Sequence, residues 1–156
     1  MSKGTLYGVG VGPGDPELLT IKAQRVLTEV SVICMPQSET SSESFAYSIA
    51  KGFIDETRQD IMRVPFPTDD EAGALSAWVG AAEEIAGMLQ NGIDVAFITE
   101  GDPMLYSTFS YVLESIKSDH PDLTVEIVPG VSSVMAAAAS ASVPLVTPGQ
   151  RLANLP

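Results

Sequence analysis

Hydrophobic residues along the chain follow two alternating patterns. Short, nearly continuous apolar runs predict buried β-strands, and segments with apolar residues every three or four positions predict helices packed on one face. The predicted strands are 4–11, 30–35, 60–64, 93–99 and 123–128, and the predicted helices are 17–29, 45–53, 70–90, 103–118 and 131–142. The longest predicted helix stops at Asn91-Gly92. Its expected apolar face comprises Leu75, Trp78, Val79, Ala82, Ile85, Ala86 and Leu89.

This alternation of strands and helices predicts an α/β fold. We expect an open, mostly parallel five-stranded sheet with helices on both faces, because helices that connect parallel strands cover both sides of a sheet. The strand at 60–64 should end at Pro65, since proline has no N–H to donate to a neighbouring strand. Ligands of such sheets bind beyond the carboxyl ends of the strands, so these ends are the first places to look for a site.

The first strand end is rich in glycine and reads Gly8-Val-Gly-Val-Gly-Pro-Gly-Asp-Pro16. Glycine lets another molecule approach the backbone, and Asp15 followed by Pro16 is typical of a helix start. The dinucleotide pattern GxGxxG is not met, because Pro13 or Asp15 stands where the third glycine would be, and no Lys-Ser/Thr pair completes a P-loop. The segment fits either a ligand without phosphate at this point or a turn that binds nothing.

Two later strand ends repeat this arrangement. The fourth predicted strand is followed by Gly101, by Asp102 as an N-cap and by Pro103 as the first helical residue. The fifth is followed by Pro129-Gly130 and then by a helix of small residues. Because the carboxyl ends of parallel strands share one edge of the sheet, we expect the three glycine segments to meet there.

Composition narrows the choice of ligand. The chain has 156 residues, of which 45% are hydrophobic and 18% charged, and this balance is that of one globular domain. Eight basic residues against 20 acidic ones give a net charge of −12, which disfavours nucleic acid as a partner. The single cysteine, Cys34, excludes an internal disulfide and is expected to be a buried thiol.

The chain shows no signal-peptide pattern, and prolines interrupt its longest stretch of low charge, residues 128–150. We therefore expect a cytoplasmic protein that does not enter a membrane. No metal site is predicted. The single histidine, His120, lies in the turn-like segment Ser-Asp-His-Pro-Asp, where a catalytic role is disfavoured.

Three segments carry a resemblance to a known family. They are Gly10-Val-Gly-Pro-Gly-Asp-Pro-Glu-Leu-Leu-Thr, Gly101-Asp-Pro-Met-Leu-Tyr-Ser-Thr-Phe and Val128-Pro-Gly-Val-Ser-Ser. In order and spacing the chain resembles the tetrapyrrole methylase family, and the continuation Tyr106-Ser-Thr-Phe is most similar to its members that methylate C20 of precorrin-2. The resemblance implies that residues 1–143 form the N-terminal α/β domain of that fold. Residues 144–156 would then be a linker toward a second α/β domain that is absent from this chain.

The resemblance further implies S-adenosyl-L-methionine as cofactor, a small-molecule tetrapyrrole as substrate and a homodimer as the assembly. It identifies no catalytic group. By position within the family's motifs, the implied cofactor-binding residues are Pro13, Glu100, Gly101, Asp102, Met104, Leu105, Tyr106, Ser132 and Ser133. Asp102 is expected both to cap its helix and to contact the ligand. Tyr106, placed in the first turn of that helix, would face either the cleft or the core.

The sequence leaves two alternatives to a precorrin-2 or cobalt-precorrin-2 C20-methyltransferase of cobalamin synthesis. One is another tetrapyrrole methylase with a different methyl acceptor. The other, from a different class of protein, is a non-catalytic module for ligand binding or dimerisation. Turnover of the cofactor would separate an enzyme from such a module.

Overall fold

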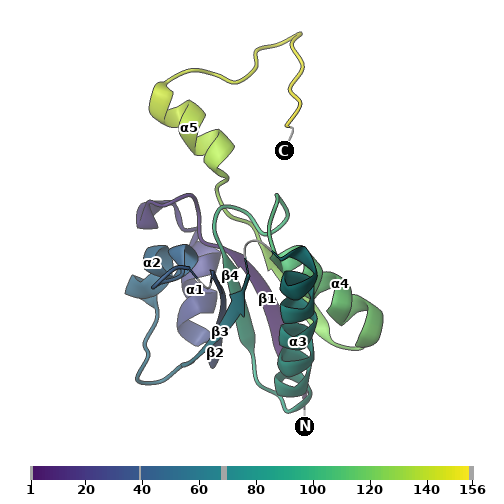
Figure 1. The fold of residues 1–156 in the computed structure, drawn as a ribbon. Helices are drawn as coiled ribbons and strands as arrows, with labels where there is room; N and C mark the ends of the chain where they lie inside the picture. Colours follow the sequence, from purple (N-terminus) through teal and green to yellow (C-terminus); the bar gives the residue numbers. More distant parts are fainter. Residues whose placement is uncertain (1, 39, 68–69, 155–156) are drawn as a thin grey trace.

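The computed structural model describes residues 2–38, 40–67 and 70–154, and a parallel five-stranded sheet lies at its centre (Figure 1). Each pair of neighbouring strands runs in the same direction, in the order β3-β2-β4-β1-β5. The predicted α/β fold is therefore confirmed. The strands are β1 (Thr5–Gly10), β2 (Val32–Ser38), β3 (Asp60–Phe66), β4 (Val95–Thr99) and β5 (Thr124–Val128).

Helices cover both faces of the sheet, as expected (Figure 1). Helices α1 and α2 pack on one face, and α3 and α4 on the other. The α-helices are α1 (Ile21–Glu29), α2 (Phe45–Ala50), α3 (Glu71–Gln90), α4 (Phe109–Asp119) and α5 (Ser133–Ala141), and two short 3-10 turns span Pro16–Leu18 and Lys51–Phe53.

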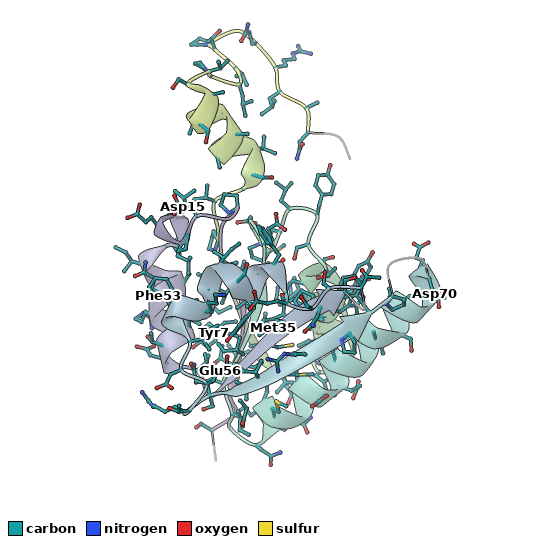
Figure 2. All side chains as sticks on the ribbon, turned by 60° about the vertical axis from the view of Figure 1, so that its left-hand side comes forward. Tyr7, Asp15, Met35, Phe53, Glu56 and Asp70 are labelled. Carbon is teal, nitrogen blue, oxygen red and sulfur yellow. The ribbon has the colours of Figure 1, made fainter. Side chains whose placement is uncertain are left out.

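The central strand β4 shows how side-chain alternation builds the core. Val95 and Phe97 point to the side of α3 and α4, whereas Ala96 and Ile98 point to the side of α1 and α2. All four residues are fully buried, as is Met35 of the neighbouring strand, which lies inside the molecule in Figure 2. A strand apolar on both sides is the pattern expected for a parallel sheet between two helix layers.

Helix α3 confirms most of its predicted apolar face. Trp78 and the four later members of the face are buried, but Leu75 and Val79 are 50% and 43% exposed. Val79 lies one position beyond the buried stripe that begins at Trp78, and Leu75 faces a shallow groove beside Tyr111 of α4. The periodicity therefore predicted the helix correctly, but the predicted apolar face included two residues that are not buried.

The prediction that strand 60–64 ends at Pro65 was wrong. Strand β3 continues through Pro65 to Phe66, and Pro65 is paired in register with Gln37 of β2. Among the described strands β3 has β2 as its one neighbour, so a missing N–H on its open side breaks no hydrogen bond of the sheet.

The prediction that a helix starts at Pro103, capped by Asp102, was also wrong, because α4 begins only at Phe109. Tyr106 adopts a left-handed backbone conformation with φ of +51°, which no α-helix can contain. The Ser107 Oγ, two residues before α4, accepts a hydrogen bond of 3.1 Å from the N–H of Phe109, its first residue. Tyr106 thus lies in a loop and not in the first turn of a helix.

At the first glycine segment the expected cap is present, but the helix is split. The Asp15 side chain accepts a hydrogen bond of 2.9 Å from the Glu17 N–H and caps the 3-10 turn that begins at Pro16. Helix α1 follows separately, with Thr20 as its own N-cap. In Figure 2, Asp15 lies at the end of the sheet from which α5 projects.

Helix α5 and the chain after it extend away from the sheet (Figure 1). None of the α5 residues is buried in this chain. The division into a domain at 1–143 and a linker at 144–156 stays a prediction. Within the described part of the chain, no helix has the length and apolar character needed to span a membrane.

Candidate functional site

Three strand ends meet at a junction of glycines, formed by Gly10 at the end of β1, Gly101 after β4 and Gly130 after β5. A Cβ atom on Gly130 would overlap the Gly101 carbonyl oxygen and lie 2.9 Å from the Gly10 Cα. Gly12 and Gly101 also exchange backbone hydrogen bonds: the Gly12 N–H donates to the Gly101 oxygen at 3.2 Å, and the Gly101 N–H donates to the Gly12 oxygen at 2.8 Å. The chain can pass this closely only because these residues have no side chains.

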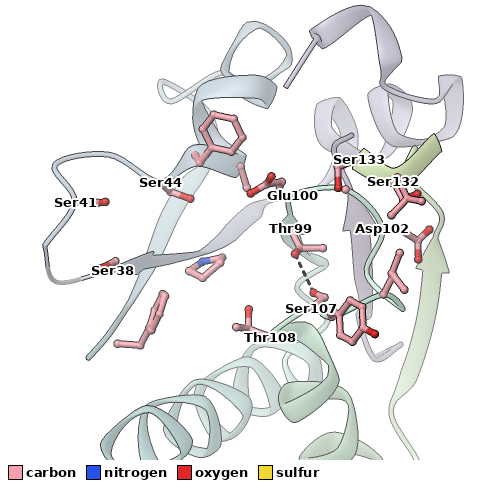
Figure 3. A pocket seen from close by; sticks show the side chains of 18 of the residues that line it. Ser38, Ser41, Ser44, Thr99, Glu100, Asp102, Ser107, Thr108, Ser132 and Ser133 are labelled. Carbon is pink, nitrogen blue, oxygen red and sulfur yellow. Dashed lines mark hydrogen bonds between the residues drawn. The ribbon is translucent and has the colours of Figure 1, made fainter. Parts of the chain in front are cut away.

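A cavity of about 640 Å³ opens beside this junction, at the carboxyl ends of β2 and β4 (Figure 3). Its walls come from the segment between β2 and α2, the loop between β4 and α4, the start of α5, and Asn154 near the end of the described chain. Hydroxyl groups are its commonest polar feature. They belong to Ser38, Ser41, Ser44, Thr99, Tyr106, Ser107, Thr108, Ser132 and Ser133.

The charged side chains that line the cavity are all acidic. They are Glu43, Glu100 and Asp102, and no described lining residue is a lysine, arginine or histidine. The Glu43 carboxylate lies 3.7 Å from the Lys51 ammonium, whereas Glu100 is exposed and forms none of the ion pairs found among the described residues. The field in the cavity favours a ligand with net positive or no charge and opposes a phosphate or a polyanion.

Most of the predicted site residues come together at this cavity. Those that line it are Glu100, Gly101, Asp102, Leu105, Tyr106, Ser132 and Ser133. Two of the predicted residues, Pro13 and Met104, are not among its lining residues. Pro13 directly follows Gly12, whose backbone pairs with Gly101. Met104 is 60% exposed and lines a separate shallow groove with Tyr111.

Tyr106 is at the mouth of the cavity and not in the core. Its side chain is 66% exposed, and its hydroxyl donates a hydrogen bond of 3.3 Å to the carbonyl oxygen of Asn154. This contact joins the loop after β4 to the segment that follows α5. Of the two orientations that the sequence left open, the structure has the one that faces the cleft.

Both carboxylate oxygens of Asp102 bind backbone N–H groups. Oδ1 accepts a hydrogen bond of 2.8 Å from Met104, two residues ahead, and Oδ2 accepts one of 2.9 Å from Gly130 in the loop after β5. The first bond shapes a local turn. The second joins two loops that are far apart in the sequence.

The sequence reasoning missed the wall formed by the end of β2, the polar segment after it and the start of α2, which contribute Ser38, Ser41, Ser44 and Phe45. Its position was the available signal, because this polar segment follows a strand that pairs with β4. Thr99 and Ser107 were missed as well. Their hydroxyls lie 2.9 Å apart and join the end of β4 to the start of α4 (Figure 3).

The histidine and the cysteine of the chain, His120 and Cys34, do not line the cavity. His120 ends α4, at the opposite edge of the sheet from the cavity, with its Nε2 3.2 Å from a carboxylate oxygen of Glu83. Burial raises the pKa of the Cys34 thiol well above its usual range. Across residues 2–38, 40–67 and 70–154, no three His, Cys, Asp or Glu side chains are grouped so that they could hold a metal ion.

Comparison with known proteins gives a family match over nearly the whole chain. Residues 5–155 match the family model described as Tetrapyrrole (Corrin/Porphyrin) Methylases. The chain is 42% identical to a protein of Methanocaldococcus jannaschii named "Probable cobalt-precorrin-2 C(20)-methyltransferase", over 97% of this chain and 63% of that protein. It is 35% identical to the cobalt-precorrin-2 C(20)-methyltransferase of Salmonella typhimurium, over 96% of this chain and 62% of that enzyme.

Solved structures agree with the fold. A cobalt precorrin-4 methyltransferase, 30% identical, superposes with a TM-score of 0.64 over 92% of this chain and 53% of its own. The uroporphyrin-III C-methyltransferase of Thermus thermophilus complexed with S-adenosyl homocysteine, 25% identical, gives a TM-score of 0.60 over 94% of this chain and 51% of its own. The chain thus spans less than two thirds of the length of these relatives.

Proposed function

The chain belongs to the tetrapyrrole (corrin/porphyrin) methylase family, and from that premise we propose that its protein is an S-adenosyl-L-methionine-dependent C-methyltransferase. The proposed acceptor is C20 of precorrin-2 or cobalt-precorrin-2, in cobalamin biosynthesis. The names of the two relatives described above support this acceptor. The solved complex of a relative with S-adenosyl homocysteine supports the choice of methyl donor.

The observation that carries the proposal is the charge and composition of the cavity. S-adenosyl-L-methionine combines a nucleoside and an amino acid with a sulfonium and has no phosphate, and when bound it supplies an activated methyl group. The cavity offers hydroxyls, a glycine backbone and carboxylates, without a described basic side chain that would attract a phosphate. A nucleotide cofactor with phosphates would instead require groups that attract an anion, such as the N-terminus of a helix.

The lining residues suit separate parts of this donor. Ser132 and Ser133 offer hydroxyls, and Gly101 leaves space for close backbone approach. Leu105, 38% exposed, offers an apolar surface against which an adenine ring could pack. Methyl transfer by in-line displacement requires alignment of donor and acceptor and exclusion of water, so these residues need to position and enclose the donor and not to act as nucleophiles.

The tetrapyrrole substrate places a different demand on the protein. Its many carboxylates would be repelled by Glu43, Glu100 and Asp102 inside the cavity. We therefore place the substrate outside this cavity, with its carboxylates bound by cationic groups other than the lining residues. Homodimer formation remains a prediction from the family resemblance, and a cytoplasmic location remains a prediction from the sequence.

The proposal is tested by methyl transfer. The full-length gene product, incubated with S-adenosyl-L-methionine and precorrin-2 or its cobalt form, should yield a tetrapyrrole heavier by one methyl group, with the new carbon at C20 by NMR. Uroporphyrinogen III serves as the control acceptor. Methylation of the control alone would replace the proposed acceptor by another one. Binding of S-adenosyl homocysteine without any transfer would favour the non-catalytic module.

A binding measurement tests the predicted domain organisation. If a second α/β domain completes the site, this chain alone should bind S-adenosyl homocysteine more weakly than the full-length gene product does. Isothermal titration calorimetry on both proteins measures the difference. Equal affinities would show that residues 1–156 contain the whole donor site and would remove the reason for invoking a second domain.

A further inference from the structure

The same Gly-Asp-Pro triplet occurs twice in this chain, as Gly14-Asp15-Pro16 and as Gly101-Asp102-Pro103. In both copies one carboxylate oxygen accepts a hydrogen bond from the N–H two residues ahead, at 2.9 Å in the first copy and 2.8 Å in the second. The local turn is therefore the same. The copies differ in the second carboxylate oxygen. Among the described hydrogen bonds, that of Asp102 accepts from a distant loop and that of Asp15 does not.

That distant contact lies where packing is tightest. The Asp102 Oδ2 accepts the Gly130 N–H at 2.9 Å, and Gly130 is packed against Gly10 and Gly101 with no space for a Cβ atom. Gly130 is followed within three residues by Ser132 and Ser133, which line the cavity. On the other side, Asp102 is followed by Leu105 and Tyr106, which line the cavity too.

From this geometry we infer that Asp102 is a positioning residue for the donor site. Its carboxylate joins the loop after β4 to the loop after β5 and so fixes the spacing of the two walls. The inference rests on the proposed function, since those walls are the ones assigned to the methyl donor. Each oxygen accepts one backbone N–H, and through these two bonds Asp102 acts on the donor site by holding the loops in place.

Asparagine at the two triplets separates the loop-to-loop bond from the local turn. Asp102→Asn keeps an oxygen for Met104 but turns an NH₂ group toward the Gly130 N–H, so a donor faces a donor. Asp15→Asn keeps its oxygen for Glu17 and breaks no described contact between loops. The second variant is thus the matched control, with the same charge removed from the same triplet.

In the full-length gene product, we expect Asp102→Asn to weaken binding of S-adenosyl homocysteine about tenfold, while Asp15→Asn stays within twofold of wild type. The KM for S-adenosyl-L-methionine should rise by a similar factor, with kcat and the KM for the tetrapyrrole changed less than threefold. A rise in the donor KM alone indicates that a wall of the donor site has moved. General destabilisation would instead lower the active fraction of the enzyme and leave this KM unchanged.

A second measurement needs no ligand. In protein labelled with ¹⁵N-glycine, the Gly130 amide should shift and exchange faster in Asp102→Asn, and should be unaffected in Asp15→Asn. This readout keeps the inference testable if the wild type binds no S-adenosyl homocysteine, a result that would overturn the proposed function. An unchanged Gly130 amide would overturn the loop-to-loop bond.

Three further results would also overturn the inference. The first is wild-type donor affinity in Asp102→Asn. The second is an equal loss in both variants, which would assign the effect to the local turn. The third is an Asp102→Asn variant that does not fold while Asp15→Asn does, which would make Asp102 a determinant of folding and not of spacing.

Discussion

The charge of Glu100 bears on which ligand the cavity prefers. It directly follows the central strand β4, lines the cavity and is exposed. Asp102, two residues on, is already bound by two N–H groups, and Glu43 lies near Lys51. Glu100 is therefore the lining carboxylate best able to favour a cation. A methyl donor with a sulfonium is such a cation, and its demethylated product has a neutral thioether in the same place.

We expect Glu100→Gln to weaken binding of S-adenosyl-L-methionine about fivefold, which corresponds to ~1 kcal/mol for an attraction between partly solvated charges. Binding of S-adenosyl homocysteine should be unchanged, because its sulfur carries no charge. Calorimetric titration of both ligands gives the ratio directly. Glu114→Gln is the control, since Glu114 is exposed on α4 outside the cavity. An equal loss for both ligands would contradict a role for Glu100 in recognising the sulfonium.

At the scale of the elements, the glycine junction decides how closely β1, β4 and β5 can end. We expect Gly130→Ala to destabilise the protein by about 3 kcal/mol, because its Cβ would overlap the Gly101 carbonyl oxygen and the surrounding atoms are backbone. Gly80→Ala is the matched control in α3, where a Cβ meets nothing within 4 Å. That change should stabilise by about 0.5–1 kcal/mol, since alanine favours a helix over glycine.

Urea unfolding followed by fluorescence of the single tryptophan, Trp78, measures both variants. Trp78 is 2% exposed in the folded protein, so its environment changes on unfolding. Equal stability of Gly130→Ala and wild type would mean that the loops can separate at little cost. The junction would then be no fixed support for the site.

The same comparison of elements shows what sequence patterns could predict. Periodicity identified each strand and α-helix of the described chain because burial on parallel strands and amphipathic helices imposes regular spacing, and β4 or α3 need nothing else. The start of α4 could not be predicted in this way. Asp102 has the local chemistry of an N-cap, but its second oxygen binds Gly130, a partner that exists only after β5 has been placed beside β1.

The candidate site likewise contains residues that the sequence could predict and residues that it could not. Glu100, Gly101, Asp102, Ser132 and Ser133 follow strands whose ends the topology brings together, so motif and position predicted them. The wall formed by Ser38, Ser41 and Ser44 could not be predicted by motif, because that polar segment has no distinctive spacing. It reaches the cavity only through the pairing of β2 with β4.

For the whole molecule, the thiol of Cys34 links folding to pH. Cys34 is fully buried on β2, and burial, with a smaller contribution from the charge of Glu84, raises its pKa well above the ordinary 9.0. In the unfolded chain the thiol ionises near that ordinary value, whereas in the folded protein it stays protonated. Above pH 9 the unfolded state therefore binds fewer protons than the folded state, and the free energy of unfolding falls as the pH rises.

One such group should lower the free energy of unfolding by about 1.4 kcal/mol for each pH unit above 9. Cys34→Ala removes this dependence at a constant cost of ~1 kcal/mol for the lost packing. Tyr47, whose pKa is raised by its hydrogen bond to Glu56, acts in the same direction in both proteins and cancels in the difference. Urea unfolding at pH 7, 8, 9 and 10 under reducing conditions should therefore show wild type more stable at pH 7 and the two proteins converging above pH 9. A difference that stays constant to pH 10 would mean that the thiol ionises as readily in the folded protein as in the unfolded chain.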